Sequence, residues 1–153
     1  MYRRILIVVA TRPEARTAVQ EGVDLARVHG AEVLLVCVVP QTVAPVVEMT
    51  PLMPMAAVDG AELETRRMAE QALEDARAVA NRAGVPCQAI ATKDGDAVRF
   101  IATFAREQRC DLVVATAEPR NALMRLLSGS VVPGLITQVT VPVLVCHEAP
   151  PAA

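Results

Sequence analysis

The stretch from Asp111 to Ser130 carries the side chains best placed to bind a ligand. It opens with the apolar run Leu112–Ala115, which is typical of a short strand buried on both faces. In open α/β sheets, ligands bind beyond the carboxyl ends of the strands, so a site is expected in the loop after this run. Arg120 and Arg125 in that loop can attract an anion, and Ser130 at the start of a helix offers a cap-type anion site.

Common catalytic and phosphate-binding signatures are absent from the sequence. The first strand is followed by Val9-Ala10-Thr11-Arg12 instead of a glycine-rich dinucleotide turn, and no P-loop occurs. The tripeptide Ser128-Gly129-Ser130 is not a nucleophile elbow. A tight turn and a helix cap explain Gly129 and Ser130 equally well. Because no nucleophile or acid–base pair is evident, the sequence does not predict an enzyme.

The residues that bind metals most often are not arranged as ligands. His29 and His147 have no acidic or cysteine neighbour in ligand spacing. The four cysteines lack the spacing of a zinc site or a redox pair, and we expect buried free thiols that act as small hydrophobic groups. They are Cys37, Cys87, Cys110 and Cys146.

The composition excludes several classes of protein. A net charge of -2 and only three aromatic residues give no electrostatic or stacking basis for nucleic-acid binding. Hydrophobic residues make up 53% of the 153 residues, but every apolar run is too short to span a membrane. The first residues lead straight into a strand-like run without a cleavage site, so no signal peptide is expected. The sequence therefore predicts a cytoplasmic protein without a membrane or nucleic-acid partner.

Strand-like and helix-like segments alternate along the whole chain. The expected strands are Ile5–Ala10, Glu32–Val39, Pro86–Thr92, Leu112–Ala115 and Val141–Cys146. The expected helices run from Pro13 to near Gly30, Ala61–Ala83 capped by Asp59, Ala97–Arg109 capped by Asp96, and Val131–Gln138. Such alternation favours an α/β fold, with one parallel sheet and helices on both of its faces.

A single domain over residues 1–148 accounts for the chain, followed by a disordered Pro/Ala tail at 149–153. The segment Gln41–Asp59 interrupts the pattern with several prolines and methionines and no single periodicity. We call this segment the Pro/Met loop. It is either a mobile surface flap, or a lid or partner-binding loop, because exposed methionine and leucine make adaptable contact surfaces.

Several motifs in series resemble the universal stress protein family. They are the opening Ile5–Val9, the long insertion after the second strand, Gly95-Asp96, Cys110-Asp-Leu-Val-Val, Leu126-Leu-Ser-Gly-Ser-Val131 and Val141-Pro-Val-Leu-Val145. The resemblance covers nearly the whole chain. It implies a five-stranded parallel, Rossmann-like domain of the adenine nucleotide alpha hydrolase-like type.

The resemblance also implies a pocket for ATP or AMP. Nucleotide-binding members carry G-x-x-G-(nine residues)-G-[ST] after the fourth strand and an aspartate just after the first strand. Carried onto this chain, the pocket would consist of Ala10, Thr11, Val38, Thr116, Arg120, Gly129, Ser130 and Val131.

The chain departs from that motif at three positions. The two first glycines fall on Thr116 and Pro119, and the aspartate falls on Thr11, so only Gly129-Ser130 is retained. Proline has no N–H to donate to a phosphate, and a β-branched residue hinders the close approach of the backbone. Two hypotheses follow. The chain is a dimeric regulatory or interaction module that binds nucleotide weakly or not at all, or it is an ATP- or AMP-binding stress protein.

The last strand predicts an assembly. Val141–Cys146 is almost entirely apolar, and in the strand order of the family it lies at an edge of the sheet. An unprotected edge strand exposes unpaired N–H and C=O groups, so something must cover it. The resemblance implies that the cover is the same strand of a second copy. We therefore expect a homodimer whose interface contains Val143, Leu144 and Val145.

Overall fold

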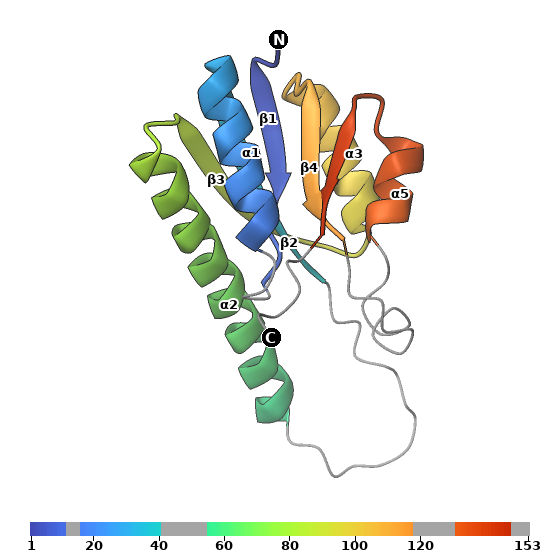
Figure 1. The fold of residues 1–153 in the computed structure, drawn as a ribbon. Helices are drawn as coiled ribbons and strands as arrows, with labels where there is room; N and C mark the ends of the chain where they lie inside the picture. Colours follow the sequence, from blue (N-terminus) through green and yellow to red (C-terminus); the bar gives the residue numbers. More distant parts are fainter. Residues whose placement is uncertain (12–15, 41–54, 118–130, 148–153) are drawn as a thin grey trace, which may run out of the picture.

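The computed structural model describes residues 1–11, 16–40, 55–117 and 131–147. Its five strands are β1 (Arg4–Val8), β2 (Glu32–Pro40), β3 (Cys87–Asp94), β4 (Leu112–Thr116) and β5 (Val143–Cys146). Its helices are α1 (Arg16–His29), α2 (Met55–Arg82), α3 (Ala97–Glu107) and α5 (Val131–Gln138). The strands form one sheet in the order β3-β2-β1-β4-β5 (Figure 1). All the strand pairs are parallel, as the sequence predicts.

Helices cover both faces of the sheet, and each face has its own hydrophobic core. On one face, α1 and α2 pack against residues such as Ile7, Leu35 and Val114. On the other face, α3 and α5 pack against residues such as Leu6 and Val113 (Figure 1). The central strands β1 and β4 are therefore buried on both faces, which explains their continuous apolar sequence.

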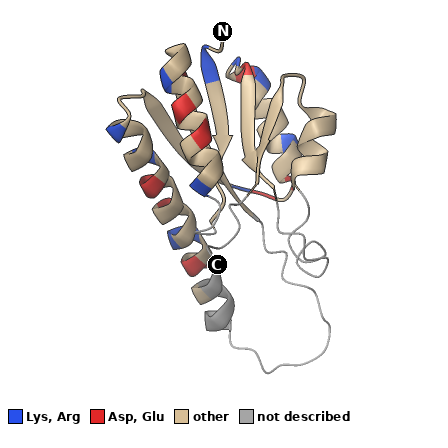
Figure 2. Cartoon of the chain, viewed as in Figure 1, with Lys and Arg blue, Asp and Glu red and all other residues tan. Residues whose placement is uncertain are grey.

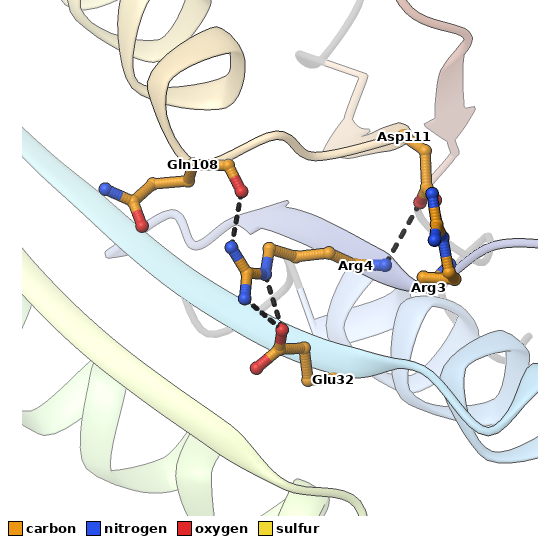
Figure 3. Close-up of polar contacts among 5 residues, drawn as sticks. All are labelled: Arg3, Arg4, Glu32, Gln108 and Asp111. Carbon is orange, nitrogen blue, oxygen red and sulfur yellow. Dashed lines mark hydrogen bonds and ion pairs between the residues drawn. The ribbon is translucent and has the colours of Figure 1, made fainter.

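Arg4 and Asp111 join the strands at the edge where they begin, which we call the amino edge (Figure 3). The Asp111 carboxylate accepts hydrogen bonds from the backbone N–H groups of Arg3 and Arg4, at 2.8 and 3.1 Å. The Arg4 guanidinium pairs with Glu32 on β2 and donates to the Gln108 carbonyl at 2.6 Å. These contacts connect the first residues of β1 to β2 and to the turn that precedes β4.

Three helices end in the same backbone motif at the amino edge. After α1, the Gly30 N–H bonds the Arg27 carbonyl and the Ala31 N–H bonds the Ala26 carbonyl. The same two bonds recur after α2 around Gly84, and after α3 around Arg109. The residue at the centre has φ of 66° at Gly30, 69° at Gly84 and 54° at Arg109. Two of the three motifs thus use glycine, whereas α3 ends on an arginine in a strained conformation.

The start of α2 corrects the sequence prediction. The helix begins at Met55, six residues before the expected Ala61, so Asp59 lies inside the helix and is not its cap. The last five residues of the Pro/Met loop are therefore helical. Methionine and alanine favour helix, and this propensity outweighs the glycine at position 60. Residues 41–54 lie outside the described part of the chain.

The ends of several strands also differ from the prediction. β1 stops pairing at Val8 rather than Ala10, and β5 begins at Val143 rather than Val141. β3 continues to Asp94, two residues beyond the expected end, because it pairs with β2 as far as Pro40. α3 ends at Glu107 and not at Arg109. None of the described helices combines the length and apolar character needed to cross a membrane.

Candidate functional site

The parallel sheet brings several predicted site residues to its carboxyl edge, where the strands end. Ala10 and Thr11 follow β1, Val38 lies two residues before the end of β2, and Thr116 is the last residue of β4. Because β1 lies between β2 and β4, these residues come from three neighbouring strands. All four residues lie near the carboxyl edge of the sheet, and that they form one nucleotide pocket stays a prediction.

Thr116 is buried at this edge. Only 8% of its surface is exposed, and it is paired with Cys146 of β5. The next residue, Ala117, donates its N–H to the Cys146 carbonyl at 2.7 Å. The backbone N–H of Ala117 is thus used within the protein and is not available to a ligand. A β-branched side chain occupies the position where the nucleotide-binding motif has its first glycine.

A cavity of about 800 Å³ borders the carboxyl end of β1. Val9, Ala10 and Thr11 line one part of it, and the rest lies between α1 and α2. Of the predicted pocket residues, Ala10 and Thr11 line this cavity, whereas Val38 and Thr116 do not. Val38 packs instead against the core under α3 and α5, on the opposite face of the sheet.

Helical residues that the sequence did not indicate form the other wall of the cavity. Arg16 and Gln20 come from α1, and Arg67, Gln71 and Asp75 come from α2. The Asp75 carboxylate accepts a hydrogen bond from Gln71 at 3.0 Å and lies 4.0 Å from the Arg16 guanidinium. Both charged side chains are largely exposed, so this pair contributes little stability. Only the packing of α1 beside α2 brings these residues together, so no local sequence signal could have shown them.

The remaining predicted residues cannot be placed in the same way. Arg120, Gly129 and Ser130 lie outside the described residues. Val131 is the first residue of α5, is half-buried and packs against the core between α3, α5 and the sheet. The structure therefore describes the β1, β2 and β4 sides of the candidate pocket, and not the loop that would hold phosphates.

The cysteines near the site are not reactive groups. Burial raises the pKa of the Cys37 thiol to about 11, and burial is also the main cause that raises the pKa of Cys146. All four cysteines are free. Cys37, Cys110 and Cys146 are buried as predicted, whereas the prediction is wrong for Cys87, which is only half-buried on the edge strand β3. Within the part of the chain that is described, no group of histidine, cysteine or acidic side chains could hold a metal ion.

Comparison with known proteins gives the family. The model of the universal stress protein family matches residues 1–147. A protein of this family from Burkholderia pseudomallei is 23% identical, with a TM-score of 0.70, covering 97% of each chain. A family protein from Arabidopsis thaliana with AMP bound is 14% identical, with a TM-score of 0.67, covering 96% of this chain and 92% of that one.

A third structure, a universal stress protein from Archaeoglobus fulgidus in complex with dAMP, is 18% identical, with a TM-score of 0.62. The match covers 94% of this chain and 97% of that one. These likenesses show a shared fold over nearly the whole length of each chain. From the family match and this fold, the chain belongs to the universal stress protein family.

Proposed function

We propose that the chain is a non-enzymatic regulatory module of the universal stress protein family that binds ATP weakly or not at all. The buried Thr116 at the end of β4 is the observation that carries this proposal. A phosphate-binding loop needs free backbone N–H groups and room for close approach. At this point of the chain, the residue is a buried, β-branched threonine, and the N–H of the following residue is bonded to β5.

The end of β1 supports the same proposal. Thr11 borders the cavity at the position where nucleotide-binding members carry an aspartate. Threonine has no charge, so it forms a weaker bond with the donor groups of a nucleoside than a carboxylate does. Pro119, further along the loop, has no N–H to donate.

Nucleotide binding is the second candidate function, and two observations favour it. The relatives from Arabidopsis thaliana and Archaeoglobus fulgidus hold AMP and dAMP. The cavity beside Ala10 and Thr11 is also large enough for a ligand of that size, because ligand pockets span roughly 300–1,000 Å³. AMP carries one phosphate, so it depends less than ATP on the loop after β4.

A gain-of-binding variant separates the two functions. Thr11→Asp, Thr116→Gly and Pro119→Gly together restore the motif of the nucleotide-binding members. If the motif alone limits affinity, the triple variant binds ATP more than about tenfold tighter than the wild type. Thr11→Ser is the matched control, because it keeps the hydroxyl and adds no charge.

Mass spectrometry of small molecules released from the purified wild-type protein should find no stoichiometric adenine nucleotide. Finding one would contradict the proposal.

We further propose that the module is a homodimer formed through β5. This strand lies at the edge of the sheet and pairs with β4 on one side. Val143, Leu144 and Val145 are only half-buried there, and Ile136 on the neighbouring α5 is 60% exposed. Pairing with a second β5 would satisfy the free backbone groups and cover this apolar surface.

A further inference from the structure

Five arginines surround the amino edge of the sheet. Arg3 precedes β1, Arg27 and Arg82 lie in the last turns of α1 and α2, and Arg106 and Arg109 lie at the end of α3. All five are exposed. Figure 2 shows the basic residues at this end of β1, α1 and α2. We call these five residues the arginine rim.

The ends of α1 and α3 are held against the first residues of β1. The Glu32 N–H bonds the Arg3 carbonyl, and the Asp111 N–H bonds the Arg4 carbonyl. The Tyr2 and His29 rings meet edge to face, with centroids 5.0 Å apart. These contacts place the ends of α1 and α3 on either side of β1.

The guanidinium groups of the arginine rim have no carboxylate partner in the described part of the chain. The nearby acidic groups are already engaged: Glu32 pairs with Arg4, and Asp111 accepts from two backbone N–H groups. Glu107 is exposed and reduces the local charge by one. The amino edge is therefore basic, although the chain as a whole carries a net charge of -2.

The helix dipole explains only part of this arrangement. Basic residues stabilise the carboxyl ends of helices, which accounts for Arg27, Arg82 and Arg106. It does not account for Arg3, which precedes a strand. It also does not account for Arg109, which has φ of 54° where the other two helix ends have glycine. A backbone strain of this kind indicates that the side chain itself has a use.

Apolar side chains are exposed at the same edge. Met1 is 97% exposed and Val28, next to Arg27, is 77% exposed. Arginine together with a few exposed apolar groups is typical of a surface that binds another protein. Since the exposed Glu107 lies among these arginines, the surface is less uniformly positive than one that binds the dense phosphates of a duplex.

We propose that the arginine rim, with Val28, binds an acidic segment of a partner protein that also carries apolar residues. The guanidinium groups would pair with its carboxylates, and Val28 would contact its apolar side chains. Apart from Arg82, which also lines the cavity between α1 and α2, this surface lies at the opposite end of the strands from Ala10 and Thr11. The proposal therefore rests neither on nucleotide binding nor on the dimer.

The test uses a fluorescein-labelled peptide of about twelve residues that repeats Glu-Glu-Leu, roughly the size of a short recognition segment. Fluorescence anisotropy should give a dissociation constant of tens of micromolar that rises steeply with salt. The same peptide with glutamine in place of glutamate should bind at least about tenfold more weakly. Absence of binding at about 1 mM overturns the proposal.

Variants locate the binding surface. Arg3→Gln with Arg109→Gly should weaken binding at least about tenfold, although Arg109→Gly relieves strain and does not harm the fold. Arg77→Gln is the matched control, because Arg77 is exposed on α2 away from its last turn. Arg77→Gln should change the affinity for the peptide less than about twofold. If it weakens binding as much as the double variant does, the peptide is held by general charge attraction and not by the arginine rim, which would contradict the proposal. Preference for phosphatidylserine vesicles over the peptide would assign the surface to a membrane and contradict the proposal.

Discussion

Arg109 is a single residue whose backbone conformation can be tested directly. It occupies the left-handed position that ends α3, with φ of 54°, where α1 and α2 end on glycine. Replacement by glycine should stabilise the protein by about 0.5–1 kcal/mol, because the side chain no longer crowds the backbone. Urea unfolding followed by circular dichroism measures the change.

The reciprocal variant Gly84→Ala should destabilise the protein by about 1 kcal/mol. A Cβ atom at Gly84 would meet nothing within 4 Å, but the positive φ at this position still disfavours alanine. A lower stability of Arg109→Gly would show that the backbone of Arg109 is not strained.

The buried thiols give a second prediction at the scale of the residue. Burial raises the pKa of Cys37 and of Cys110 to about 11, from 9.0. At pH 8 the thiolate fraction of each is about one in a thousand, so iodoacetamide should modify the half-buried Cys87 first. The pKa values of these two thiols are higher in the folded than in the unfolded protein. Their contribution to stability is therefore complete below pH 9 and is lost as the pH rises toward 11. Peptide mapping of the native protein checks the order of labelling, and early modification of Cys37 would contradict it.

The sequence can predict which residues lie near the ends of parallel strands, but not which of them line the same cavity. Ala10, Thr11, Val38 and Thr116 could be assigned to one edge because parallel strands end together. The cavity wall formed by Arg16 and Arg67 could not be predicted, because it depends on the angle and spacing between two helices. No local pattern encodes that distance.

At the scale of the element, Gly22 sets how closely α1 approaches the sheet. A Cβ atom there would lie 2.5 Å from Cδ1 of Ile7, which is fully buried. Gly22→Ala should therefore destabilise the protein by about 1–3 kcal/mol, despite the better helix propensity of alanine. Thermal unfolding measures the effect. Adding Ile7→Val removes Cδ1 and should recover part of the loss.

Gly60 provides the control for Gly22. It lies within α2, and a Cβ atom there would meet nothing within 4 Å. Gly60→Ala should stabilise the protein by about 0.5–1 kcal/mol through helix propensity alone. If both alanine variants destabilise the protein equally, close packing of α1 on β1 is not the cause.

The boundaries of the elements show where local sequence is insufficient. For the strands and helices that the structure describes, the central residues follow from short apolar runs in the strands and from apolar periodicity in the helices. The start of α2 at Met55 was missed because Asp59 and Gly60 together resemble the end of a loop and a helix cap. The extension of β3 to Asp94 was missed because pairing with β2 holds polar residues in the strand. For α2, the summed helix propensity outweighs the local signal, and for β3 the pairing with a neighbouring strand does so.

At the scale of the molecule, the proposed dimer predicts twice the 16.3 kDa mass of the chain. Light scattering after size exclusion measures it. Val145→Lys should shift the protein toward monomer, because it places a charge in a buried interface. Gln88→Lys is the control, since Gln88 is exposed on β3 at the opposite edge of the sheet. A wild-type monomer at tens of micromolar would rule out the dimer.

The central claim is that this member of the universal stress protein family does not hold ATP tightly. Isothermal titration of the wild-type protein with ATP and magnesium is the most direct test. The buried Thr116 and the uncharged Thr11 predict a dissociation constant weaker than about 10 μM, or no detectable heat of binding. A dissociation constant below about 10 μM, equivalent to a binding free energy near -7 kcal/mol, would contradict the claim.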